Sequence, residues 1–303
     1  MKRPNEVFTP GALPESTYIT RMSASGFTYE ERLKQALNVS GFLTLISGPS
    51  KTGKTVLCEK VIGPESLVEI SGSDMLSPSE LWPQIGMKAG MPYEGTAKTG
   101  RQTHDDMEEI YFLTKENVLS YFNEHALVLF VDDFHDASKE MQVFMAQQFK
   151  DAIRKGLRLI IASLPHQAAD IIRANPDLQG RISMIDLQAW DKEELEQIPK
   201  KGFKALNLSV SGDIIELLAK GSIASPQLMQ LICLNICILA ESRNLKVIDT
   251  GLAKDAFTFS NLNLDYDKVV DVMQKGKSSR GQTAETDLLK EKYHSDRFLS
   301  TLV

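Results

Sequence analysis

The sequence predicts an α/β protein with a doubly wound, mostly parallel sheet, followed by a small helical domain. Short apolar runs typical of buried strands alternate with helical patterns through the first 190 or so residues. A glycine-rich octet joins the first of these runs to a helix, and two aspartates follow a later run. Beyond about residue 190 the apolar residues recur at helical spacing.

The octet fits the pattern G-x-x-x-x-G-K-[ST]. In that pattern backbone N–H groups surround nucleotide phosphates, the lysine reaches the β- and γ-phosphates, and the hydroxyl ligates Mg²⁺. Its residues are Gly48, Pro49, Ser50, Lys51, Thr52, Gly53, Lys54 and Thr55. A surface loop can match by chance, but the strand-type run 42–47 and the helical run 56–62 on its two sides favour an anion site. We therefore expect the octet to bind ATP, with Thr55 as a ligand of Mg²⁺.

A second apolar run, residues 126–131, ends in Asp132 and Asp133. Carboxylates at the C-terminal end of a parallel strand lie where doubly wound sheets bind ligands. We expect Asp132 to join the shell of Mg²⁺ and Asp133 to orient or deprotonate the attacking water. The alternative is that the two aspartates cap a helix that starts near Ala137.

Other runs complete the predicted sheet and its helices. Strands are expected at residues 66–71, 157–163 and 182–187, and helices around 79–86 and over 139–154. The strand at 66–71 separates the octet strand from the aspartate strand along the chain.

Composition limits the classes of partner. The formal net charge of -6 gives no overall positive field, so contact with DNA needs a local basic patch or an oligomer that concentrates one. No apolar run is long enough to span a bilayer and no signal peptide is recognisable, so we expect a cytoplasmic protein. Cys58, Cys233 and Cys237 lie in apolar helical patterns, which favours core packing over disulfides or a metal site.

These motifs resemble the P-loop ATPases of the AAA+ and STAND type. Residues 190–198 are similar to the segment that opens the helical lid in that group, and residues 219–230 to its sensor-2 helix. The likeness covers about residues 14–245 and is nearest to origin-recognition ATPases, transposition-regulator ATPases and bacterial defence switches. It implies a sheet of ASCE type and four segments: a linker and first helix of the nucleotide clasp (1–40), the ATPase core (41–189), the lid (190–250) and a helical or flexible end (251–303).

The resemblance also implies roles for residues outside the octet. Tyr18 and Arg21 belong to the linker that clasps adenine, and Pro226 starts a lid helix that lies against the base. Ser163 would hold the attacking water as a sensor, although a hydroxyl at a strand end also serves as a helix cap.

An arginine before the last strand can reach a neighbouring subunit's site in ring- or filament-forming members of the group. Arg181 is the first candidate and Arg173 the second, and either would offset charge on the γ-phosphate. Either one can also be an ordinary solvated arginine. An arginine that reaches a neighbouring subunit's site implies an ATP-dependent homo-oligomer.

Two departures from the group affect the expected function. Asp133 is shorter than the glutamate often found there, which favours slow hydrolysis or a switch role, and Gln227 stands where an arginine is usual in the lid. One hypothesis is an oligomerising ATPase that acts on DNA or on a DNA-bound partner. The other is a signalling adaptor that hydrolyses slowly or not at all and activates a separate effector protein. The basic run 274–282 is a candidate phosphate contact or a solvated linker.

Overall fold

The structure, a computed structural model, describes residues 2–93, 113–165, 178 and 180–263. Arg173 and the basic run 274–282 lie outside the described residues. The chain divides into two units, which we call the α/β unit (within 22–48 and 57–187) and the helical unit (within 2–21, 49–56 and 188–263). Seven residues of the octet, 49–55, are therefore grouped by their contacts with the helical unit, and Gly48 belongs to the α/β unit.

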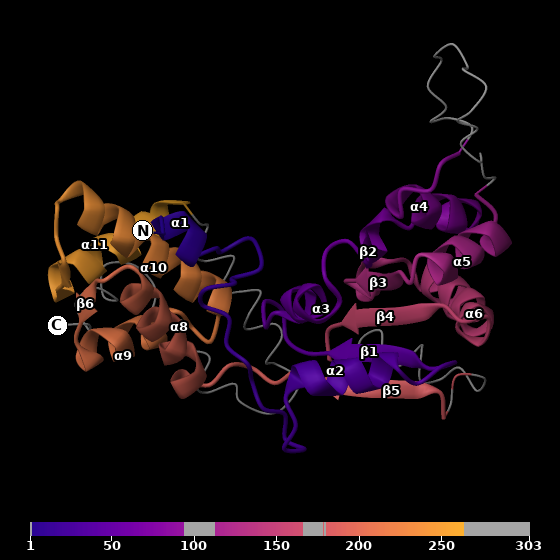
Figure 1. The fold of residues 1–303 in the computed structure, drawn as a ribbon, viewed down its shortest axis with the longest axis horizontal. Helices are drawn as coiled ribbons and strands as arrows, with labels where there is room; N and C mark the ends of the chain where they lie inside the picture. The colour runs from indigo at the N-terminus through magenta and orange to yellow at the C-terminus, as the bar shows by residue number, and fades with distance from the viewer. Residues whose placement is uncertain (1, 94–112, 166–177, 179, 264–303) are drawn as a thin grey trace, which may run out of the picture. The chain divides into compact units, whose positions relative to one another are not determined.

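Parallel strands form the sheet of the α/β unit, in the order β2-β3-β4-β1-β5 (Figure 1). They are β1 (Leu43–Ser47), β2 (Leu67–Ser71), β3 (Val128–Asp132), β4 (Arg158–Ser163) and β5 (Ile182–Asp186). β4 lies between the octet strand β1 and the aspartate strand β3. The predicted doubly wound parallel sheet is confirmed, with each strand within two residues of its expected bounds.

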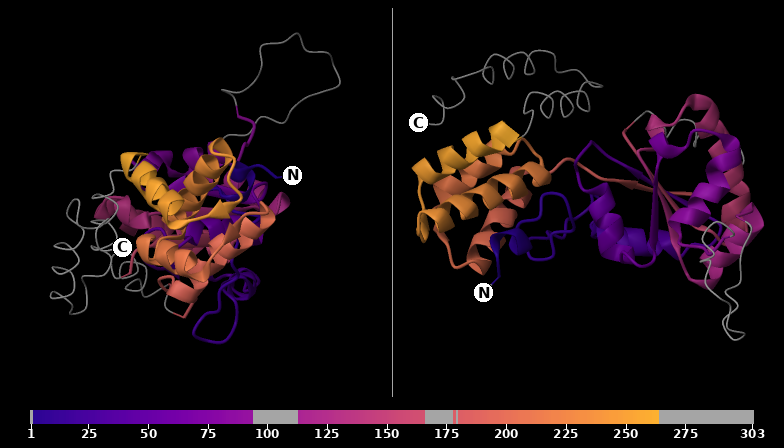
Figure 2. Two further views of the ribbon diagram at one scale, coloured as in Figure 1. Left: turned by 90° about the vertical axis from the view of Figure 1, so that its left-hand side faces the viewer. Right: turned by 90° about the horizontal axis from the view of Figure 1, so that it is seen from above.

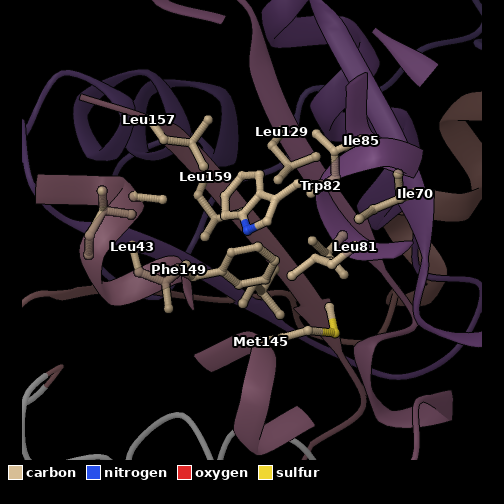
Figure 3. Close-up of a cluster of buried hydrophobic side chains, with 14 of the residues drawn as sticks. Leu43, Ile70, Leu81, Trp82, Ile85, Leu129, Met145, Phe149, Leu157 and Leu159 are labelled. Atoms are coloured by element: carbon tan, nitrogen blue, oxygen red, sulfur yellow. The ribbon is translucent and has the colours of Figure 1, made fainter. Parts of the chain in front are cut away.

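Helices cover both faces of this sheet. They are α2 (Tyr29–Leu37), α3 (Lys54–Ile62), α4 (Leu81–Lys88), α5 (Lys115–Glu124) and α6 (Lys139–Arg154). Alternate strand residues face opposite sides, so on β1 Ile46 packs with α2 and α3 while Leu45 packs with α4, α5 and α6. Figure 3 shows the cluster on the side of α4, α5 and α6, in which Trp82 meets Phe149 edge-on with ring centroids 6.4 Å apart. The helix expected around 79–86 begins at Leu81, after a 3-10 turn, η2 (Pro78–Glu80).

The helical unit has a separate apolar core, and its longer helices lie side by side (Figure 2). Its elements are α1 (Pro4–Val7), α8 (Lys192–Ala205), β6 (Ser209–Val210), α9 (Gly212–Gly221), α10 (Pro226–Ser242), β7 (Val247–Ile248) and α11 (Thr250–Asn263). The N-terminal segment contributes to this core: the buried Phe8 ring lies 5.4 Å from that of Phe203. Gly202 permits the approach, because a Cβ there would lie 2.1 Å from Cζ of Phe8.

The three cysteines are buried and free, as the sequence predicts: Cys58, Cys233 and Cys237. Burial raises the pKa of the Cys237 thiol to about 12, so it stays protonated near neutral pH. Within the described ranges no group of three or more His, Cys, Asp or Glu side chains could hold a metal ion. Each helix in these ranges is too short or too polar to cross a membrane.

Candidate nucleotide site

The octet forms the turn between β1 and α3. Lys51 and Gly53 have positive φ, 61° and 95°, and are separated by one residue of ordinary φ. Left-handed residues that alternate with ordinary ones can turn successive backbone N–H groups toward one side and form an anion-binding concavity. The loop leads directly into the N-terminus of α3, where the helix leaves further N–H groups without helical partners. This backbone geometry suits phosphate groups.

Lys54 is the first residue of α3, and its side chain turns back into the loop. It is 7% exposed, and Nζ donates a hydrogen bond of 3.0 Å to the carbonyl of Pro49. The Thr52 hydroxyl donates to the same carbonyl at 2.9 Å. Burying an ammonium group is costly unless polar or charged partners compensate it, and a phosphate in the loop would supply the opposite charge. Thr55 follows in the first turn of α3 and is half-buried.

Asp132 ends β3, and Asp133 starts the turn that follows. Asp133 has left-handed backbone angles, φ 43° and ψ 44°, and its N–H donates to Oδ1 of Asp132 at 2.8 Å. The cap of α6 is Ser138, whose hydroxyl accepts from the Met141 N–H at 3.2 Å. Neither aspartate therefore caps α6, and Asp133 makes no side-chain cap to the 3-10 turn η4 (Phe134–Asp136).

Negative charge gathers at this end of β3. Burial, together with the charges of Asp132 and Glu59, raises the pKa of Glu69 on β2. Burial and the same acidic surroundings raise the pKa of the Cys58 thiol in α3 well above its usual value. A bound cation would relieve this repulsion, and carboxylate oxygens are ligands that Mg²⁺ prefers. Asp132, at the end of β3, offers such oxygens to the expected Mg²⁺.

Ser163 lies at the same edge of the sheet as the start of the octet. Its carbonyl accepts from the Gly48 N–H at 3.3 Å, which joins the end of β4 to the end of β1. Its hydroxyl is buried and donates to the carbonyl of Leu164 at 2.8 Å. In this structure the hydroxyl predicted to hold water therefore bonds to the neighbouring backbone.

Arg181 lies at the opposite end of the strands, where β1 and β5 begin. It precedes β5, and its carbonyl accepts from the N–H of Leu43, the first residue of β1, at 2.9 Å. Gly48 follows the other end of β1, so the length of a five-residue strand, about 16 Å, separates it from the Arg181 backbone. The Arg181 side chain is exposed. Within one copy of the α/β unit, Arg181 and Gly48 are thus far apart.

Tyr18 and Arg21 belong to the helical unit. The half-buried Tyr18 accepts a hydrogen bond of 2.9 Å at its carbonyl from Nζ of Lys201. Arg21 is 7% exposed, and its Nε lies 2.8 Å from Oε2 of Glu194. These contacts tie the expected clasp residues to α8.

Pro226 is the first residue of α10, as predicted, and Gln227 beside it is exposed. Ser225 caps the helix by accepting from the Leu228 N–H at 3.2 Å. The two preceding residues have positive φ: 50° at Ile223 and 56° at Ala224. A β-branched residue rarely adopts this region, and sequence analysis has no signal for it there.

Two residues outside the motifs, Trp190 and Gly72, contact parts of the site. Trp190 donates from Nε1 to the carbonyl of Thr52 at 2.9 Å. Gly72 follows β2, and a Cβ there would lie 2.4 Å from the carbonyl oxygen of Asp133. The octet pattern specifies neither of them, because both contacts are long-range.

Gly72→Ala tests whether this close approach holds the acidic turn. The nearest atoms are backbone atoms of Asp133 and Phe134, which cannot swing aside as a side chain does. We expect the free energy of unfolding to fall by about 1–3 kcal/mol in urea titrations. Gly11→Ala is the control, because a Cβ at Gly11 has no heavy atom within 4 Å. Equal stability of the two variants would contradict the packing described for Gly72.

Solved structures of other proteins share the fold of this chain. No protein-family model and no curated protein matches the sequence. Among solved structures, a RuvB variant of Thermotoga maritima has a TM-score of 0.51 at 13% identity, over 78% of this chain and 70% of its own. The Walker-type ATPase of Pyrococcus abyssi has 0.56 at 15%, over 81% and 74%. Cdc6p of Pyrobaculum aerophilum has 0.55 at 15%, over 98% and 97%. At such identities the likeness is one of fold alone, and this chain shares its fold with these three proteins.

Proposed function

We propose that this chain binds ATP with Mg²⁺ through residues 48–55 and hydrolyses it. The observation that carries the proposal is the Lys54 ammonium group, held inside a loop with positive φ at Lys51 and Gly53. A loop of this kind at a helix N-terminus offers backbone N–H groups and one positive charge to an anion. The AAA+ fold agrees with this chemistry at the level of architecture.

Each residue of the proposed site has its own role. The octet backbone and Lys54 hold the β- and γ-phosphates, while Thr55 and Asp132 hold Mg²⁺, which neutralises phosphate charge when bound. Asp133, which is exposed just beyond β3, orients or deprotonates the attacking water. For the adenine side, the proposal follows the family resemblance and uses Tyr18, Arg21 and Pro226.

We further propose that ATP promotes a homo-oligomer that regulates a partner protein. Arg181 is exposed at the end of β1 opposite Gly48, so the Arg181 of another copy would complete a site. Gln227 brings no positive charge from the helical unit. With a net charge of -6, an association with DNA would depend on a local patch or on the partner.

The alternative is an adaptor that binds ATP and hydrolyses it slowly or not at all. It is favoured by the short carboxylate at Asp133 and by the Ser163 hydroxyl, which donates to the carbonyl of Leu164. In this alternative, nucleotide binding closes the lid segment, exposes an assembly surface and activates the partner protein. The two readings differ in turnover.

Lys54→Ala tests ATP binding itself. Loss of the ammonium group removes the point charge on the β- and γ-phosphates, so we expect the dissociation constant for MgATP to rise by roughly 100-fold or more. Isothermal titration calorimetry measures it, with Lys60→Ala, an exposed lysine of the same helix, as control. A folded Lys54→Ala protein with unchanged affinity would falsify the binding proposal.

Asp133→Asn tests hydrolysis separately from binding. The amide keeps the size of the side chain but cannot take a proton, so phosphate release should fall about 100-fold while ATP affinity changes by a few-fold at most. Asp136→Asn, an exposed aspartate of the same turn, is the control and should keep its turnover. A wild-type rate that is already as low as that of Asp133→Asn would favour the adaptor reading over the ATPase.

Arg181→Ala tests the shared site. We expect ATP binding within about two-fold of wild type and a turnover at least ten-fold lower, because the lost charge acts only between copies. Light scattering across a dilution series gives the oligomeric state, and Arg154→Ala, also exposed, is the control. A protein that stays monomeric with ATP, with a specific activity independent of dilution, would rule out the shared site.

A further inference from the structure

Trp190 connects the body of the helical unit to the octet. Its indole ring is half-buried and packs against the apolar core of that unit, just before Asp191, the N-cap of α8. Its Nε1 donates a hydrogen bond of 2.9 Å to the carbonyl of Thr52. Thr52 is 4% exposed and belongs to the same unit as Trp190. The contact is thus a partly buried connection between the start of α8 and the middle of the octet.

This hydrogen bond determines how one peptide group of the octet is oriented. The carbonyl of Thr52 and the N–H of Gly53 belong to the same peptide, which is trans and planar, so they point in opposite directions. With the carbonyl directed at Trp190, the Gly53 N–H is directed away from the indole. Gly53, at φ 95°, has no side chain to resist rotation of this peptide, so a flip would otherwise be easy.

Arg21 in turn fixes the indole. Its guanidinium carbon lies 4.6 Å from the centroid of the Trp190 ring, which is cation–π distance. Its Nη2 donates to the carbonyls of Gln188 and Ala189 at 3.1 and 3.0 Å, and its Nε to Glu194 at 2.8 Å. The guanidinium therefore holds both the chain that enters Trp190 and the first turn of α8.

We propose that Trp190 is a positioning residue for phosphate binding: it fixes the peptide between Thr52 and Gly53 so that the Gly53 N–H donates to a phosphate oxygen. The inference rests on the proposed function of the octet and extends it to the helical unit. Because the indole is held by Arg21, phosphate binding and the order of the segment around residue 21 are coupled. A phosphate bound to the Gly53 N–H stabilises the hydrogen bond between Trp190 and Thr52. Loss of that hydrogen bond lowers the affinity for phosphate by the same factor.

Trp190→Phe tests this role, because it keeps an aromatic ring under Arg21 and removes the N–H. We expect the dissociation constants for MgATP and for inorganic tripolyphosphate to rise together, each about five-fold, as for the loss of one hydrogen bond. Trp82→Phe is the matched control: Trp82 is 8% exposed in the α/β unit and donates to Gln148 Oε1 at 3.3 Å. That variant should bind both ligands like wild type.

The outcomes separate this inference from the proposed function. If wild type binds neither ligand, the proposed function fails and this inference with it. If wild type binds both and Trp190→Phe binds them equally well, only the positioning role is wrong. A Trp190→Phe protein that loses affinity for ATP and keeps it for tripolyphosphate also overturns the role, since Trp190 would then act on the base.

A second measurement needs no change at Trp190. The chain has two tryptophans, so the Trp82→Phe protein has a single indole N–H signal in a ¹⁵N correlation spectrum, that of Trp190. We expect this signal to exchange slowly with solvent and to shift when tripolyphosphate binds. A rapidly exchanging signal that does not respond to the ligand would overturn the inference even if Trp190→Phe failed to fold.

Discussion

Parallel pairing of β1, β4 and β3 is the constraint on which the candidate site depends. Ser47 pairs with Ser163 in register, and Asp132 ends the strand on the far side of β4. Each strand therefore presents its carboxyl end at the same edge, where the octet begins and the acidic turn starts. Such a sheet is stable only when helices bury both faces, because all five strands are rich in apolar residues. The two apolar clusters of the α/β unit thus position the chemistry at its edge.

Several parts of the site are costly in isolation and are compensated by their surroundings. Lys51 and Asp133 have side chains yet adopt left-handed backbone angles, and Lys54 buries a positive charge. Some compensating contacts lie within the motifs, such as the bond from Lys54 to the Pro49 carbonyl. Others come from outside them: Gly72 leaves room for the acidic turn, and Trp190 binds the octet backbone. Residues outside the phosphate-binding pattern therefore decide how that pattern is presented to a ligand.

The N-terminal segment is part of the helical unit although about 170 residues separate the two along the chain. The Thr17 hydroxyl donates to the Val7 carbonyl at 3.1 Å and accepts from Nε2 of Gln230 at 2.7 Å, in a buried network. Phe8 completes the apolar core over Gly202. This packing holds the segment that leads to Arg21, so the order of the N-terminus and the orientation of Trp190 depend on the same core.

The sequence by itself determined the parts whose signals are local. The strands are apolar runs of strand length, the octet is a contiguous pattern between a strand and a helix, and the aspartates lie at the end of an apolar run. Tertiary structure decided the rest. It brought Trp190 to Thr52 and buried Phe8 in a core that its own short segment does not predict. It also produced the short β6 and β7 pair. The reason is physical: propensity and periodicity act over a few neighbouring residues, whereas these contacts join residues whose proximity arises only when distant segments pack against each other.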